Sequence, residues 1–208
     1  LYDQFVLGKE TPYRIIHTVP PPFKEHVLSI PFIHNHHRDY IAIVFGLCFL
    51  TYIVSHVLLS VCSSRYRAFP TIEKSEVVER IVSTLHAVSV FTLAAVGVVF
   101  DKQLYLDPIL GVPLPYYMGL QYSISAGYFL ADTIMLIIFR IPQWQPVLIH
   151  HILATIGCFG ILGPYVQYAY IGIVLFLTEF TNPFNNADFF FRQFGMEWSL
   201  IDKCSKGL

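Results

Sequence analysis

Residues 40–62, "YIAIVFGLCFLTYIVSHVLLSVC", form a long apolar stretch that contains no Asp, Glu, Lys or Arg and a single histidine, His56. A helix needs about 20 consecutive apolar residues to cross the hydrocarbon core of a bilayer, and this stretch is long enough. Residues 117–139 form a second stretch of the same kind, in which Asp132 is the only acidic residue. The two stretches predict membrane-spanning helices and therefore an all-α membrane protein.

The composition of the whole chain agrees with this prediction. Of the 208 residues, 55% are hydrophobic and only 13% are charged, and the mean hydropathy is +0.57. A soluble domain carries about 25% charged residues. The net charge of −1 and the lack of a basic run argue against a nucleic-acid partner. The four cysteines have the spacing of neither a metal site nor a disulfide framework.

Three further apolar stretches predict a multi-pass transmembrane helix bundle with about five spans. They cover residues 81–100, 147–162 and 165–181. Only the dipeptide "GP" separates the last two stretches. These two therefore form a tight hairpin, or one of them is short and does not fully cross the bilayer.

The pattern divides the chain into three parts. Residues 1–39 are polar and interrupted by prolines, which predicts an N-terminal arm or interfacial segment. Residues 40–195 hold the membrane domain, and residues 196–208 are expected to form a C-terminal interfacial tail. The chain begins with leucine. We therefore expect either that a leader has been removed or that the chain is part of a longer protein. In the second case the full protein has more spans, and the tail of this chain is truncated.

Basic residues beside the ends of the spans predict the orientation in the membrane. With alternating spans, six lie on one side and three on the other: Arg65, Arg67, Lys74, Arg80, Arg140 and Arg192 against Lys24, Arg38 and Lys102. Because basic residues are retained on the cytosolic side, we expect the first group to face the cytosol or its organelle equivalent. The membrane itself, endoplasmic reticulum or another such as the mitochondrial inner membrane, stays open.

Titratable residues inside the spans are expected to lie at similar depth. Counted along helices from the arginine-rich side, at 1.5 Å per residue, most lie within about 6–12 Å of that face; they are His56, His86, Asp132, His150, His151 and Glu179. An isolated charge inside a bilayer is costly unless it is paired or wet. The pattern therefore predicts a shared polar cavity that opens toward the arginine-rich side.

Two interpretations of this polar group stay open. Histidine with carboxylate is the combination used for general acid–base chemistry near neutral pH, which makes His150, His151, Asp132 and Glu179 the candidate catalytic residues. Adjacent histidines point about 100° apart on a helix, so one is expected to face the cavity while the other packs or orients it. Alternatively, the polar residues form interhelical hydrogen bonds or a partly wet vestibule.

Neighbouring polar positions are candidate lipid contacts: His86, Ser83, Ser125, Asn182 and Asn185. No metal site is expected. The histidine cluster "HNHH" at residues 34–37 lacks a carboxylate or cysteine partner at a fixed spacing, so an interfacial segment is the favoured interpretation of that cluster.

Four motifs in order resemble successive blocks of the TLC-domain family, which includes the ceramide synthases. They are "ERIVSTLHAVSVF" (79–91), "SAGYFLADTIMLIIF" (125–139), "VLIHHILATIGCF" (147–159) and "FLTEFTNPFNNADFFFRQFG" (176–195). The stretch "EFTNPFNN" resembles the branch of TLC-domain-containing protein 4 more than the ceramide synthases. The resemblance implies a helical membrane domain around a lipid-accessible cavity.

The resemblance also implies what the cavity handles. In ceramide synthases a paired histidine serves acyl transfer from acyl-CoA, and His150 and His151 match that pair. The later His-Asp-x-x-Asp element of those enzymes has no counterpart in "LTEFTNPFNN", which argues against ceramide synthesis. We therefore expect binding or handling of acyl lipids or sphingolipids, with membrane lipids as partners. No cofactor is expected, unless acyl-CoA or a bound phospholipid serves as one. The alternatives are an accessory subunit of a membrane complex with a degenerate lipid site, and an acyl-CoA-dependent acyltransferase.

Overall fold

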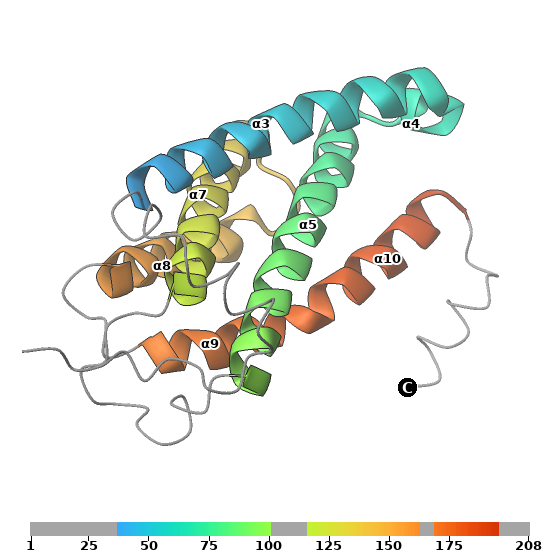
Figure 1. Cartoon of the computed structure of the whole chain (residues 1–208). Coiled ribbons are helices and arrows are strands. Elements are labelled where there is room, and N and C mark those ends of the chain that lie inside the picture. The colour runs from blue at the N-terminus through green and yellow to red at the C-terminus, as the bar shows by residue number, and fades with distance from the viewer. Residues whose placement is uncertain (1–36, 101–115, 163–168, 196–208) are drawn as a thin grey trace, which may run out of the picture.

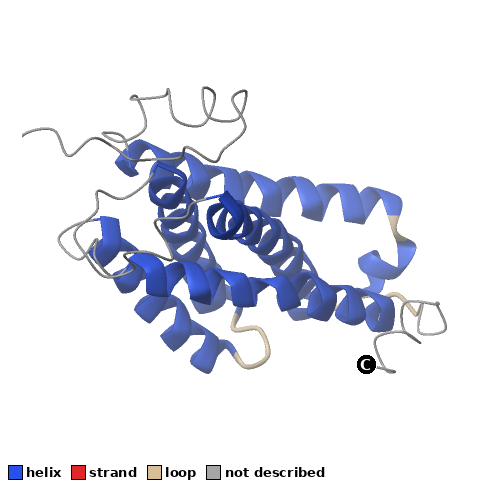
Figure 2. Ribbon diagram, turned by 60° about the horizontal axis from the view of Figure 1, so that its bottom comes forward, coloured by secondary structure: helices blue, strands red, loops and turns tan. Residues whose placement is uncertain are grey.

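A computed structural model describes residues 37–100, 116–162 and 169–195. These residues form helices and short connections, and no strand occurs among them (Figure 2). The elements, in order, are α3 (His37–Cys62), α4 (Ser64–Ala68), α5 (Thr71–Phe100), α7 (Tyr116–Phe139), α8 (Trp144–Leu162), α9 (Ala169–Thr178), the 3₁₀ turn η2 (Glu179–Thr181) and α10 (Asn182–Gln193). The predicted all-α class is confirmed.

Among the described residues, four helices are long and apolar enough to cross a membrane: α3, α5, α7 and α8. Of the fifth expected span, the structure describes residues 169–181, in which α9 has 10 residues, or about 15 Å of helix. The chain then continues through η2 into α10, whose first turn contains Pro183, a residue suited to a helix start. The connection between α8 and α9, residues 163–168, lies outside the described residues. The expected tight hairpin therefore stays a prediction.

Some predicted boundaries were wrong. Helix α5 begins at Thr71 rather than at residue 81, and α4 forms between the first two predicted spans. The side chain of Ser63 accepts a hydrogen bond from the backbone N–H of Tyr66 at 3.1 Å and so caps α4. Helix α8 begins three residues early, at Trp144, and α3 begins at His37. The rest of the predicted arm and the predicted tail lie outside the described residues.

Helix α7 lies at the centre of the bundle and packs against α3, α5 and α8, whereas α9 and α10 lie along α5 (Figure 1). Its buried residues alternate small and aromatic side chains, among them Tyr122, Ala126 and Phe129. Helices α3 and α8 instead expose rows of large aliphatic side chains, such as Leu50 and Ile156. Exposed apolar rows on helices of this length are the surfaces that face lipid.

One glycine sets the distance between the two most closely packed helices. A Cβ atom on Gly127 of α7 would lie 2.8 Å from the carbonyl oxygen of Ile41 and 2.8 Å from Cβ of Val44, both on α3. Small residues at such crossings let transmembrane helices approach closely. This crossing places the middle of α3, with Tyr52, against the part of α7 that carries Asp132.

Candidate functional site

A cavity of about 360 Å³ lies between α5, α7, α8, η2 and α10, with the loop at residues 141–143 on its rim. Its wall is mostly polar. Seven of the nine sequence-predicted site residues line it: Ser83, His86, His150, His151, Glu179, Asn182 and Asn185. The structure thus brings these positions together, from four separate elements, at one depth in the bundle.

The eighth predicted residue, Asp132, lies directly behind His151. Its side chain is fully buried, and its Oδ2 atom lies 3.2 Å from Nδ1 of His151. Its Oδ1 atom accepts a hydrogen bond from the hydroxyl of Tyr52 on α3. Asp132 Oδ2 and His151 Nδ1 have no aligned hydrogen-bond partner among the described residues. Each of these two atoms is the polar atom that faces the other. The carboxylate therefore orients the Nδ1 side of the ring, and Nε2 is the nitrogen left for a ligand.

The ninth predicted residue, Ser125, supports His86 from behind. The Oγ atom of Ser125 lies 3.2 Å from Nε2 of His86. The imidazole is also stacked on the ring of Tyr128, with centroids 4.0 Å apart and planes 13° from parallel. His86 is therefore fixed between α5 and α7 by two contacts, as the interhelical interpretation predicts for a polar residue in a bundle.

The two adjacent histidines differ in their surroundings, as expected from their angular separation. His151 is buried, whereas His150 is exposed. The ring of His150 lies edge-on to Phe129, with centroids 6.0 Å apart. Both side chains reach the cavity wall, so the expectation that only one of them faces the cavity was wrong.

The opposite wall comes from the turn after α9. Because this helix ends at Thr178, the single 3₁₀ turn places Glu179 at the cavity, where its carboxylate accepts a hydrogen bond from the side-chain amide of Asn182. The turn is held in place by Asn186, whose amide nitrogen donates to the hydroxyl of Thr84 at 2.9 Å and whose oxygen accepts from Arg80 at 3.1 Å. These bonds tie α10 to α5.

Sequence reasoning missed several wall and support residues: Tyr52, Glu76, Glu79, Arg80, Tyr128 and Asn186. The second span was predicted to begin at about residue 81, after the first turns of α5. A helical spacing was available as a signal, because Glu79, Ser83 and His86 follow one another at i, i+4 and i+7. Tyr52 carried no such signal, since a tyrosine in an apolar run is indistinguishable from a core residue.

His56 was wrongly placed in the shared cavity. It lies on α3, away from the other histidines, and its Nδ1 atom lies 2.8 Å from the hydroxyl of Tyr66 on α4. A phenol is protonated at neutral pH, and burial raises the pKa of Tyr66 further. Depth along the helix predicted the level of His56 in the membrane but not the direction in which its side chain points.

Comparison with known proteins agrees with this architecture. The family model of the TLC domain matches residues 76–206, more than half of the chain. The chain belongs to the TLC-domain family. All the residues that line the polar cavity fall within the matched range. The match begins inside α5, so the predicted start of the domain at residue 40 stays a prediction.

Curated relatives carry the same domain. The chain is 26% identical to TLC domain-containing protein 4-B of Xenopus laevis over 152 residues, which are 71% of this chain and 55% of the relative. It is 27% identical to TLC domain-containing protein 4 of Homo sapiens over 144 residues, which are 69% of this chain and 54% of the relative. The chain thus spans about half the length of these relatives. No solved structure gives a significant match.

Proposed function

We propose that this TLC-domain membrane protein binds an acyl lipid within the bilayer and that the polar cavity receives the head end of that lipid. The observation that supports this proposal is the cavity itself, a polar space inside an otherwise apolar bundle. Its volume of about 360 Å³ falls within the range of about 300–1,000 Å³ typical of ligand sites.

Some polar side chains of the cavity wall have hydrogen-bond partners within the protein, and others do not. His86 is held by Ser125, and Glu179 is held by Asn182. The exposed side chains of His150 and Asn185 have no hydrogen-bond partner among the described residues. Unsatisfied polar groups in a bilayer are costly. A ligand that offers ester, amide or hydroxyl groups to these two side chains removes that cost, and acyl lipids carry such groups beside the chain.

Mass spectrometry of the lipids that co-purify with the protein tests the proposal. We expect one acyl-lipid class to be enriched with the wild type and reduced about tenfold or more in His150→Ala/His151→Ala, because losing hydrogen bonds worth about 1.4 kcal/mol weakens binding tenfold. Gln145→Ala is the control on the same helix, since it removes an exposed polar side chain outside the cavity. Bulk membrane lipid in all preparations would contradict the proposal and favour a structural subunit of a larger complex.

The pairing of His151 with Asp132 supports a second candidate, an acyltransferase. A buried carboxylate beside Nδ1 orients an imidazole so that Nε2 accepts a proton. In that role His151 would take the proton from an acceptor amine or hydroxyl as this group attacks the thioester of acyl-CoA, and the thiol of CoA would leave. Release of free CoA thiol by the purified protein, abolished in His151→Ala and retained in His56→Ala, is the expected result. No release with any acceptor would exclude this candidate.

A further inference from the structure

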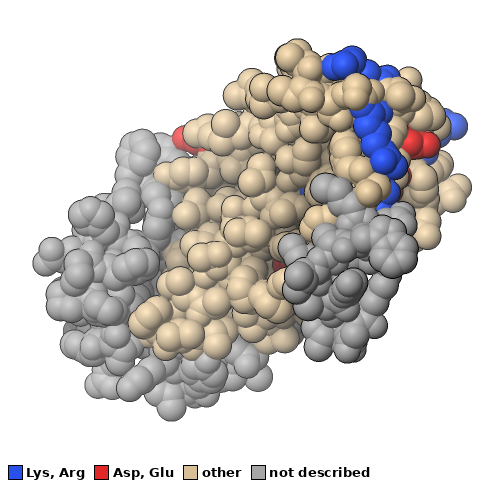
Figure 3. Space-filling model, turned by 90° about the vertical axis from the view of Figure 1, so that its right-hand side faces the viewer, with Lys and Arg blue, Asp and Glu red and all other residues tan. Residues whose placement is uncertain are grey.

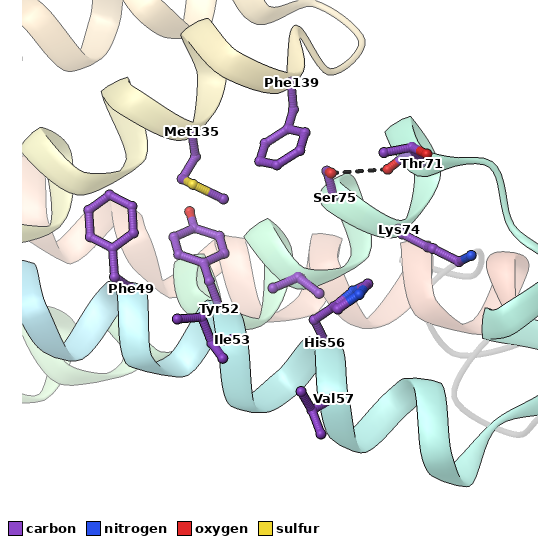
Figure 4. Close-up of a pocket in the computed structure, with 11 residues that line it drawn as sticks. Phe49, Tyr52, Ile53, His56, Val57, Thr71, Lys74, Ser75, Met135 and Phe139 are labelled. Atoms are coloured by element: carbon purple, nitrogen blue, oxygen red, sulfur yellow. Dashed lines mark hydrogen bonds between the residues drawn. The ribbon is translucent and has the colours of Figure 1, made fainter.

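A second cavity, of about 540 Å³, has Tyr52 in its wall (Figure 4). It is formed by the middle of α3, the first turns of α5 and the last turns of α7, and none of the sequence-predicted site residues lines it. We call it the lateral groove; its wall consists of Phe49, Tyr52, Ile53, His56, Val57, Thr71, Lys74, Ser75, Val78, Met135 and Phe139.

The lateral groove opens toward lipid and is amphipathic along its length. Ile53 and Val57 are 62% and 52% exposed on the outer face of α3, so a molecule in the bilayer reaches the groove without entering the bundle. Figure 4 shows Phe49, Tyr52 and Met135 at one end and Lys74 at the other. One end of the groove is therefore apolar, and the other presents an ammonium group.

The ammonium group of Lys74 is available and lies near the membrane surface. Lys74 has no ion pair among the described residues. It stands in the first turn of α5, a helix of 30 residues, or about 45 Å. The hydrocarbon core is about 30 Å thick. The first turn of so long a helix therefore lies at the level of the lipid headgroups.

The surroundings of Lys74 carry further positive charge. Lys and Arg side chains gather in a band on the face that includes the α4 end of the molecule (Figure 3). Helix α4 contributes Arg65 and Arg67, and Arg67 donates to the carbonyl oxygens of Ser60 and Val61 at the end of α3. Arg65 and Arg67 do not line the groove, and Glu73 stands beside Lys74 in the first turn of α5. Lys74 is therefore the cation that attracts an anionic group in the groove.

We propose that the lateral groove binds one acyl chain of an anionic phospholipid from the surrounding leaflet, with the phosphate of the headgroup at Lys74. An acyl chain gains little by leaving lipid for an apolar groove, because bilayer and groove are equally apolar. Selection among lipids must then come from the headgroup, and a basic position at the cytosolic face selects negative charge.

A lipid in the lateral groove would also contact Tyr52, which supports the polar cavity through Asp132. The ring of Tyr52 lines the groove, and its hydroxyl donates to Asp132, the carboxylate beside His151. Asp132 and His151 thus lie between Tyr52 and the polar cavity. The lateral site does not depend on the proposed function of the polar cavity, since the two cavities have no lining residue in common.

Native mass spectrometry of the full chain, delipidated in detergent and mixed with equal amounts of dioleoyl phosphatidylglycerol and dioleoyl phosphatidylcholine, tests the proposal. We expect about fivefold more phosphatidylglycerol than phosphatidylcholine on the wild type, the preference that one basic residue gives. Lys74→Gln should lose this preference. Arg38→Gln, which removes one exposed charge at the opposite end of α3, should keep it.

A steric pair of variants tests the groove itself. Ile53→Trp fills the groove and should remove the retained phosphatidylglycerol, whereas Ile43→Trp, at a similarly exposed position of α3 outside the groove, should not. His150→Ala/His151→Ala should retain the preference, which separates this site from the polar cavity. Equal retention of the two lipids by the wild type, or an unchanged preference in Lys74→Gln or Ile53→Trp, would overturn the proposal.

Discussion

The hydroxyl of Tyr52 connects two parts of the molecule that the sequence keeps 80 residues apart. It donates to the fully buried Asp132, whose second oxygen faces His151. Removing one partner of a buried bond leaves the other without compensation. The position of His151 therefore depends on a residue of α3, a helix that contributes nothing to the wall of the polar cavity.

We predict that Tyr52→Phe destabilises the protein by about 0.6–1.7 kcal/mol, the usual range for a polar contact between transmembrane helices. Thermal unfolding in detergent measures this change. Tyr40→Phe is the control on the same helix, because its hydroxyl has no hydrogen bond within the part of the chain that the structure describes, and a shift below about 0.5 kcal/mol is expected there. Equal shifts in the two variants would show that the Tyr52–Asp132 bond contributes nothing.

At the scale of single elements, the crossing of α3 and α7 is the most sensitive contact. A Cβ on Gly127 would meet backbone and side-chain atoms of α3, whereas a Cβ on Gly46 would meet nothing within 4 Å. We predict that Gly127→Leu destabilises the bundle by about 1–3 kcal/mol, because a side chain has to be forced into a packed crossing. Gly46→Leu should leave the unfolding temperature nearly unchanged. A loss in Gly46→Leu as large as that in Gly127→Leu would contradict this account of the crossing.

The attachment of α10 to α5 depends on one amide side chain. Asn186 is buried and bonds both Arg80 and Thr84, whereas the neighbouring Asn185 is exposed. We predict that Asn186→Ala speeds hydrogen exchange of the α10 backbone several-fold in lipid-free detergent, because losing about 1 kcal/mol of attachment raises the open population about fivefold. Asn185→Ala should leave exchange unchanged. The same acceleration in both variants would show that the effect does not come from the bonds of Asn186 to Arg80 and Thr84.

At the scale of the whole molecule, hydropathy predicted which segments cross the membrane but not where every helix begins. Residues 71–80 look polar because Glu73, Lys74 and Glu76 interrupt them, yet Val77 and Val78 are buried in the core. A helix that extends beyond the hydrocarbon region has such mixed first turns. Hydropathy alone therefore shortened α5 and missed the part that carries Lys74 and Arg80.

The membership of the polar cavity was predictable to a considerable extent because alternating spans return to the same face. Residues at equal depth, such as His86, His151 and Glu179, were therefore expected to meet, and the structure places them on one cavity wall. Depth does not give the direction of a side chain around its helix, which is why His56 was misplaced. Contacts between helices, such as the bond from Tyr52 to Asp132, depend on helix pairing, which no periodicity in a single sequence reports.

The measurement that tests the central claim most directly is photo-crosslinking in reconstituted vesicles. The probe is a phosphatidylcholine with a diazirine on the acyl carbon next to the ester, followed by mapping of the crosslinked peptides. If the polar cavity receives the head end of an acyl lipid, crosslinks should concentrate on His150 and Asn185 and their neighbours and be lost with excess unlabelled lipid. Crosslinks confined to lipid-facing residues of α3 and α8, such as Leu50 and Ile156, would contradict the claim.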